Sequence, residues 1–385
     1  MSNERERWAD FAKGIGIIFV IIGHIKYVDN SIKEWIYTFH MPLFFFISGY
    51  FINKHYGLLK DIGHKAYILL IPYFILSVIE FILEDILLIL FGMTPEHMTI
   101  KHLVGSIIQF PYPNEYESTF WFFGCLFITS VILLALVYIF KENKYKILAT
   151  STILMVIGTI LINVLKIRLI WNIDIALIMT FYASFGYFVK QSHILDKYNS
   201  IDKKYKILII MVCGILGILF MKLTNIDGHI DYYTRNIKSP VYCLLAGISN
   251  IILIVALSNM IETYFKNRKK ANNLKSKLEI FRSEDIEYIG RNSGAFYVLS
   301  AWGIHVGYLA VILLKQVVEI RYRCTATIIS LITAIMLPIP IILILNKTLP
   351  HIFRNGNTKK KTIPKDNIEV REEKRAYSTI HENNA

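Results

Sequence analysis

The sequence predicts an all-α integral membrane protein with about ten transmembrane helices and both termini in the cytoplasm. Hydrophobic residues make up 54% of the 385 residues and charged residues only 18%, a balance typical of integral membrane proteins. The charged residues lie in short clusters between apolar runs that are long enough to cross a hydrocarbon core about 30 Å thick. Because lipid offers the backbone no hydrogen-bond partners, we expect each apolar run to be helical.

Ten such runs follow one another along the chain. They cover residues 11–28, 35–52, 66–91, 119–140, 147–165, 168–188, 207–222, 240–264, 289–314 and 326–346. We expect residues 1–346 to form one membrane domain. Residues 347–385 are polar and rich in charged side chains, which predicts a basic, disordered cytoplasmic tail.

The distribution of basic residues predicts the orientation. With the amino terminus in the cytoplasm, the cytoplasmic loops and both tails carry 30 of the 42 Lys and Arg residues, and the outer loops carry 11. The net charge of +13 is therefore mainly a topology signal. Its basic residues are spread over separate loops, so we expect contacts with membrane lipid and none with nucleic acid.

The four cysteines carry no sign of a disulfide framework or a metal site. They are Cys125, Cys213, Cys243 and Cys324, which fall in different apolar runs without paired spacing. We expect them to behave as small buried hydrophobic residues. No metal ion and no permanently bound cofactor is predicted.

Lys13 and His24 lie eleven residues apart in the first apolar run. That spacing puts both side chains on one face of a helix, about 16 Å apart along its axis. A cation near one membrane surface and an imidazole half a bilayer away suit a ligand with a charged head and a long thin arm. Acyl-coenzyme A has that shape.

Three histidines are expected at a similar depth in the outer half of the membrane. They are His24, His40 and His305, on the first, second and ninth runs. For each one alone, an ordinary interfacial histidine is at least as good an interpretation as a catalytic one. Because polar groups inside a membrane usually mark function, the three together favour a site, most strongly at His24.

Several motifs resemble those of the acyltransferase family 3 membrane enzymes. Arg7-x-x-Asp10-x-x-Lys13-Gly14 followed by His24 resembles the family's opening Arg/Lys-x10-His element. Phe39-His40-Met41-Pro42-Leu43, continued by Phe44-Phe45-x-x-Ser48-Gly49, is similar to its second motif, in the form closest to the fucose 4-O-acetylase-like branch. Weaker matches are Ile71-Pro72-Tyr73, Trp121-Phe122-Phe123 and Ile289-Gly290-Arg291-Asn292-Ser293 with Tyr297.

The resemblance implies that residues 1–346 transfer an acyl group, usually acetyl, from cytoplasmic acyl-coenzyme A to an envelope or capsular carbohydrate. It predicts a multi-pass protein of the bacterial plasma membrane. One position departs from the pattern. Members of this branch often carry histidine three residues after the tyrosine that matches Tyr297, and this chain has Ser300 there. His305 lies roughly 140° further round the helix and is no simple substitute.

The proposed reaction needs a group that activates the sugar hydroxyl. A neutral imidazole beside that hydroxyl can accept its proton as attack on the thioester begins, and we assign this role to His24. His40 is expected to orient His24, to donate to the leaving thiolate or to stabilise the oxyanion, and the sequence leaves the three roles open.

The remaining candidates bind the two substrates. Arg7, Lys13 and Arg291 are expected to hold the phosphates of the coenzyme, and Ser48 is expected to line the tunnel for its arm. Trp121 is a candidate for stacking on the acceptor sugar, although an interfacial aromatic belt explains it equally well. For Asp174, a capping or solvated aspartate competes evenly with an acceptor-binding one.

A transporter or polysaccharide exporter is the competing class, since intramembrane His and Asp also serve coupling. Unbroken apolar runs and the lack of an obvious inverted repeat weigh weakly against it. The acceptor sugar, the hydroxyl that is modified and the nature of the acyl group stay open.

Overall fold

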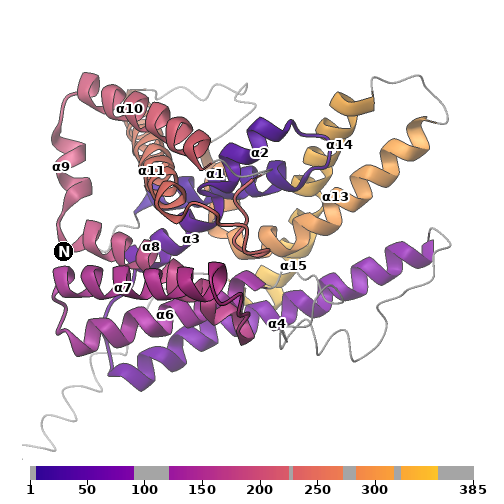
Figure 1. Cartoon of the computed structure of the whole chain (residues 1–385). Helices are drawn as coiled ribbons and strands as arrows, with labels where there is room; N and C mark the ends of the chain where they lie inside the picture. The colour runs from indigo at the N-terminus through magenta and orange to yellow at the C-terminus, as the bar shows by residue number, and fades with distance from the viewer. Residues whose placement is uncertain (1–5, 91–120, 225–228, 272–282, 316–321, 354–385) are drawn as a thin grey trace, which may run out of the picture.

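The computed structural model describes residues 6–90, 121–224, 229–271, 283–315 and 322–353. The regular elements of these residues are helices (Figure 1). They are α1 (Arg7–His24), α2 (Asn30–Tyr37), α3 (His40–Tyr50), α4 (Leu58–Leu90), α6 (Trp121–Ile139), α7 (Lys144–Asn163), η1 (Ile170–Asn172), α8 (Ile173–Gln191), α9 (Ile194–Ser200), α10 (Lys203–Leu223), α11 (Pro240–Ala271), α12 (Ser283–Arg291), α13 (Ser293–Lys315), α14 (Tyr322–Met336), α15 (Pro338–Thr348) and α16 (Pro350–Phe353).

Within the described residues, eight helical segments are long and apolar enough to cross a membrane. They correspond to the last eight of the ten predicted runs, so the prediction of an all-α membrane protein is confirmed. The orientation of the termini stays a prediction. The predicted disordered tail lies mostly outside the described residues, but its first seven residues, 347–353, complete α15 and form α16.

The first two predicted runs differ from simple membrane spans. Helix α1 carries Arg7, Asp10 and Lys13 within 18 residues, more charge than an ordinary span tolerates. The second run is broken at Thr38 and Phe39, and its second part, α3, has only 11 residues. Because most residues of α1 and α3 are buried, protein rather than lipid surrounds these two helices.

Two further runs that were predicted as continuous are also broken. The run 289–314 divides at Asn292 into α12 and α13, and the run 326–346 divides at Leu337 into α14 and α15. Pro338 begins α15, and because proline has no N–H it cannot continue the hydrogen-bond ladder of α14.

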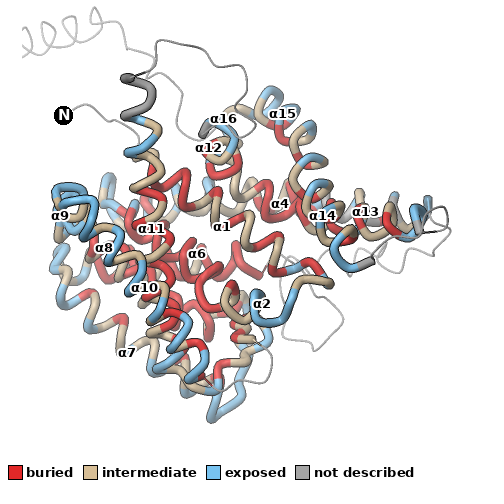
Figure 2. The backbone as a smooth tube through the Cα atoms, turned by 90° about the horizontal axis from the view of Figure 1, so that it is seen from above, coloured by how far each residue is buried: buried red, intermediate tan, exposed pale blue. Residues whose placement is uncertain are grey.

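The helices surround α1 and α3. Figure 1 shows α6, α7 and α8 side by side, with α13 and α14 packed as a pair at the opposite edge. Figure 2 shows the buried residues concentrated at the centre of the molecule, around α1 and α6. In the candidate membrane span of α8, 72% of the residues are buried, against only 11% in that of α10. Helix α10 therefore lies at the periphery of the bundle, where we expect its apolar side chains to face lipid.

Glycines set the closest helix crossings. A Cβ on Gly14 would overlap the carbonyl oxygen of Ile286, and one on Gly290 would overlap that of Asp10, so α1 and α12 touch backbone to backbone. Helices α3 and α8 meet in the same way through Gly49 and Gly186. Small residues that let helix backbones approach are typical of membrane interfaces, and here they bring Arg291 beside Asp10.

Candidate active site

Two neighbouring cavities lie among the helices that carry the predicted site residues. The larger, about 610 Å³, is enclosed mainly by α1, α3, α4, α6 and α13, and we call it the donor cavity. The smaller, about 80 Å³, lies at the junction of α1 and α3, and we call it the histidine cavity. Tyr297 lines both of them.

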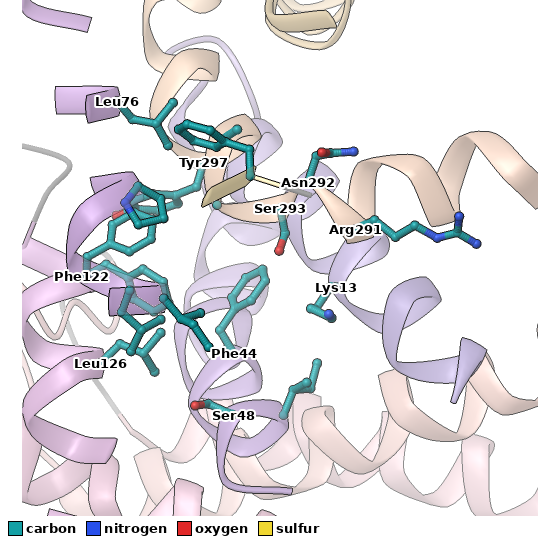
Figure 3. A pocket seen from close by; sticks show the side chains of 18 of the residues that line it. Lys13, Phe44, Ser48, Leu76, Phe122, Leu126, Arg291, Asn292, Ser293 and Tyr297 are labelled. Carbon is teal, nitrogen blue, oxygen red and sulfur yellow. The ribbon is translucent and has the colours of Figure 1, made fainter. Parts of the chain in front are cut away.

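The donor cavity is charged on one side and apolar on the other. Lys13, Lys65 and Arg291 line it together with the hydroxyl-bearing Ser48. In Figure 3, Lys13 and Arg291 lie on one side and Phe122 and Leu126 on the other, and the guanidinium of Arg291 extends away from these two apolar side chains. This arrangement fits a ligand with an anionic head and an apolar arm. The sequence analysis did not single out Lys65.

Two buried carboxylates, Asp10 and Glu287, hold Lys13 and Arg291 at this cavity. Asp10 Oδ1 lies 3.3 Å from Lys13 Nζ, and Asp10 Oδ2 lies 3.6 Å from Arg291 Nε. Glu287 Oε2 accepts a hydrogen bond of 2.8 Å from Arg291 Nη2, and the other carboxylate oxygen of Glu287 pairs with Arg7. Arg7 is not among the residues that line the donor cavity. Arg7 instead forms an ion pair with Glu287, and Glu287 in turn positions Arg291.

His24 and His40 meet at the histidine cavity. His24 is the last residue of α1, His40 is the first of α3, and their ring centroids lie 6.3 Å apart. His24 is exposed, whereas His40 shows only 4% of its surface. His24 also lines the cavity, so a ligand bound there would lie beside its ring.

Backbone carbonyls determine which nitrogen of each ring carries a proton. His24 Nδ1 lies 2.8 Å from the Val20 carbonyl oxygen, and His40 Nδ1 lies 3.0 Å from that of Ile36. A carbonyl can only accept, so each Nδ1 donates. In a neutral ring, Nε2 then keeps its lone pair and is able to accept a proton. Both histidines therefore present a basic nitrogen away from their own helices.

The loop of residues 229–237 closes the histidine cavity. Its residues Ile230, Asp231, Tyr232 and Tyr233 line the cavity, and the backbones of Asp231 and Asn236 pair in an isolated antiparallel bridge. We call this segment the 229–237 loop.

Trp121 and Asp174, both predicted to bind the acceptor, have different places at this loop. Trp121 lines the histidine cavity and packs against Tyr233 at a ring distance of 5.7 Å. Asp174 is completely buried, and its Oδ2 lies 3.1 Å from Nε of Arg235. Its Oδ1 also accepts a hydrogen bond from the Leu169 backbone N–H. Contact between Asp174 and a substrate stays a prediction, and its observed role is to hold the loop.

His229 and Asp231 belong to this region and were missed by the sequence analysis. The His229 ring packs against Tyr37 in a tilted arrangement with a centroid distance of 3.9 Å, and the Tyr37 ring lies 4.5 Å from the His40 ring. Burial lowers the pKa of His229, and the negative charge of Asp231 opposes that shift. The sequence feature that could have indicated them is the segment 229–237, which is rich in polar and aromatic residues and lies between two apolar runs.

The third predicted histidine does not join the other two. His305 is exposed on α13 and is not among the residues that line either cavity. Ser300 is buried, and its hydroxyl donates to the Tyr297 carbonyl oxygen at 3.3 Å.

The prediction that all four cysteines are small buried residues is only partly correct. Cys125 and Cys243 are buried, but Cys324 is exposed. Among the residues that the structure describes, no group of three or more His, Cys, Asp or Glu side chains is placed to hold a metal ion.

The fold and the two cavities define a multi-pass membrane protein whose interior joins a cationic, partly apolar cavity to a histidine pair. Residues 6–346 match the family described as Acyltransferase domain. The chain belongs to this acyltransferase family, and the resemblance inferred from its motifs is confirmed at that level.

Two relatives share parts of the chain. Nodulation protein NolL of Mesorhizobium japonicum is 30% identical over 178 residues, which are 42% of this chain and 44% of the relative. Nodulation protein NolL of Sinorhizobium fredii is 38% identical over 84 residues, which are 18% of this chain and 23% of the relative. The chain thus spans less than half the length of these curated relatives. No solved structure matches it.

Proposed function

We propose that this protein is an O-acyltransferase that moves an acyl group, by preference acetyl, from acyl-coenzyme A to a sugar hydroxyl of a cell-envelope or exopolysaccharide glycan. The observation that carries the proposal is the pair of cavities that share Tyr297. One provides cations and an apolar wall, and the other provides two imidazoles. Membership of the acyltransferase family supports the class of reaction.

In this proposal the donor occupies the larger cavity. Lys13, Lys65 and Arg291 would bind the phosphates of the coenzyme by charge-assisted hydrogen bonds. The arm would extend past Ser48 and the phenylalanines of α3 and α6 towards Tyr297. The thioester carbon would then lie at the boundary of the histidine cavity.

The chemistry follows from the ring nitrogens. The sugar oxygen attacks the thioester carbonyl carbon while His24 Nε2 accepts the hydroxyl proton. A C–O bond forms and the C–S bond breaks, and the proton returns from the imidazolium to the departing coenzyme thiolate. His40 is the second group able to act at the leaving sulfur or the oxyanion.

The proposed acceptor is a sugar, and the proposed location is the bacterial plasma membrane with both termini in the cytoplasm. The form of the Phe39–Leu43 motif, which is similar to that of fucose 4-O-acetylases, supports a sugar acceptor. The Lys and Arg distribution supports the orientation.

A direct assay tests this function. Purified protein in liposomes is incubated with radiolabelled acetyl-coenzyme A and envelope glycan, and label in the glycan is measured. The same glycan, isolated from cells with and without the protein, is compared by mass spectrometry for added acetyl groups. We expect protein-dependent labelling and a matching mass difference. Movement of glycan across the bilayer without labelling would instead identify a transporter.

A further inference from the structure

Asp231 brings a negative charge to the histidine cavity. The other lining residues are the two histidines and aromatic or apolar side chains: Tyr37, Met41, Trp121, Ile230, Tyr232, Tyr233 and Tyr297. Among these residues Asp231 is the acidic one. Small-molecule sites combine apolar and aromatic walls with a few polar groups that orient the ligand. The histidine cavity has this composition, with one carboxylate, two imidazoles and several aromatic rings, and a sugar ring would fit it.

The 229–237 loop that carries Asp231 is fixed from several helices. Arg235 binds Asp174 on α8 and also donates 2.8 Å to the side-chain oxygen of Asn172. The hydroxyl groups of Tyr232 and Tyr182 lie 3.2 Å apart. The contacts of Arg235 and Tyr232 with η1 and α8 therefore hold the loop that carries Asp231, as a preorganised binding group requires.

The two oxygens of Asp231 differ in what they contact. Oδ1 accepts the backbone N–H of Tyr233 at 2.9 Å and that of Thr234 at 3.4 Å, which closes the turn. Such side-chain turns are a common use of aspartate in loops. Because Oδ1 serves the turn, Oδ2 is the oxygen with which Asp231 can meet a ligand.

We propose that Asp231 binds the acceptor sugar by accepting a hydrogen bond from a hydroxyl next to the one that is acylated. This assignment rests on the proposed function and adds an acceptor-binding residue to it. His24 takes the proton of the reacting hydroxyl, and Asp231 selects sugars whose neighbouring hydroxyl points to the 229–237 loop. Trp121 and Tyr233 offer the aromatic faces for the ring.

The test uses Asp231→Asn, which keeps the turn-forming oxygen but removes the negative charge. Asp196→Asn is the matched control, because Asp196 is exposed on α9 and lines neither cavity. The full chain in nanodiscs is assayed with labelled acetyl-coenzyme A and a panel of methyl glycosides, including methyl fucoside. For the best acceptor of the parent protein, every monodeoxy derivative is assayed as well.

We expect Asp231→Asn to raise the acceptor KM about 10- to 100-fold, the loss that one hydrogen bond to a charged group causes. The donor KM and thermal stability should match the control. One monodeoxy sugar should be a poor acceptor for the parent and no worse for the variant, because both changes remove the same contact.

An unchanged acceptor KM would overturn the assignment. It would also be overturned if the variant used every monodeoxy sugar less well than the parent does, so that the two losses of kcat/KM multiplied. If the parent protein hydrolyses acetyl-coenzyme A but acylates no glycoside, the sugar acceptor of the proposed function is wrong, and Asp231 loses its role with it.

Discussion

Single side chains at the rim of the donor cavity determine whether it can hold an anion. Lys13 and Arg291 share the buried Asp10, which keeps both cations in place but also offsets part of their charge. Lys65 adds a third cation from α4. Glu287 also pairs with Arg291, so two carboxylates offset part of the charge of these cations. An anionic head would meet the positive charge that remains, including that of Lys65.

Lys13→Ala should raise the Michaelis constant for acetyl-coenzyme A about tenfold or more, while the acceptor constant stays unchanged. Lys13→Arg keeps the charge and should lose less. Lys54→Ala is the matched control, since Lys54 also pairs with a carboxylate, Glu142, at 3.0 Å but lies outside both cavities. A donor constant equal to that of the control would limit Lys13 to a role in topology.

Part of this site follows from the sequence at the level of residues. The eleven-residue spacing predicts that Lys13 and His24 share a helix face, and each lines one of the two adjoining cavities. Asp231 could not be found in that way. It lines the same cavity as the histidines although it lies far from them in the sequence, and the loop that carries it is held by the ion pair of Asp174 with Arg235.

At the scale of elements, the helix that carries His40 depends on a close crossing. The backbone of α3 touches α8 through Gly49, where a Cβ would overlap the Ala183 carbonyl. The backbone cannot move aside there without displacing α3 and the histidine at its start.

Gly49→Ala should therefore destabilise the protein by about 1–3 kcal/mol, as overpacking of a tight interface does. Gly63→Ala on α4 is the matched control, because a Cβ at Gly63 meets no atom within 4 Å. Thermal unfolding in detergent of the two variants gives the comparison. Equal midpoints would show that α3 and α8 do not pack as closely as described.

The length of an apolar run predicts a membrane helix well, but it does not predict where that helix is broken. All eight candidate spans fall on predicted runs, because lipid forces an apolar stretch of that length into a helix. The break at Thr38 follows no such rule, since apolar residues continue on both sides. The break at Asn292 falls in a short stretch without large apolar residues, 290–294, at the start of its predicted run. The break at Thr38 depends on tertiary packing, in contrast to the break before Pro338.

At the scale of the whole molecule, the predicted orientation would give the proposed reaction a direction. If both termini lie in the cytoplasm, Lys13 faces the cytoplasmic side and the 229–237 loop faces the outside. Donor and acceptor would then enter from opposite sides and meet at Tyr297.

Single cysteines in a cysteine-free background test this orientation. Asn199→Cys, in the last turn of α9, should react with an impermeant thiol reagent only in inverted vesicles, and Ile167→Cys, between α7 and α8, only in intact cells. Both positions are exposed. The reverse labelling pattern would place the donor cavity on the outer side.

The central claim is that His24 is the base of an acyl transfer. His24→Asn keeps approximate volume and hydrogen-bonding capacity but cannot accept a proton at neutral pH. The decisive measurement is the rate of acetyl transfer from labelled acetyl-coenzyme A to the acceptor glycan by this variant, with the exposed His193→Asn as the matched control and with donor affinity and thermal stability equal to the parent. We predict a loss of about 10²- to 10⁴-fold for His24→Asn and none for the control. A near-normal rate in the folded, donor-binding His24→Asn protein would contradict the claim.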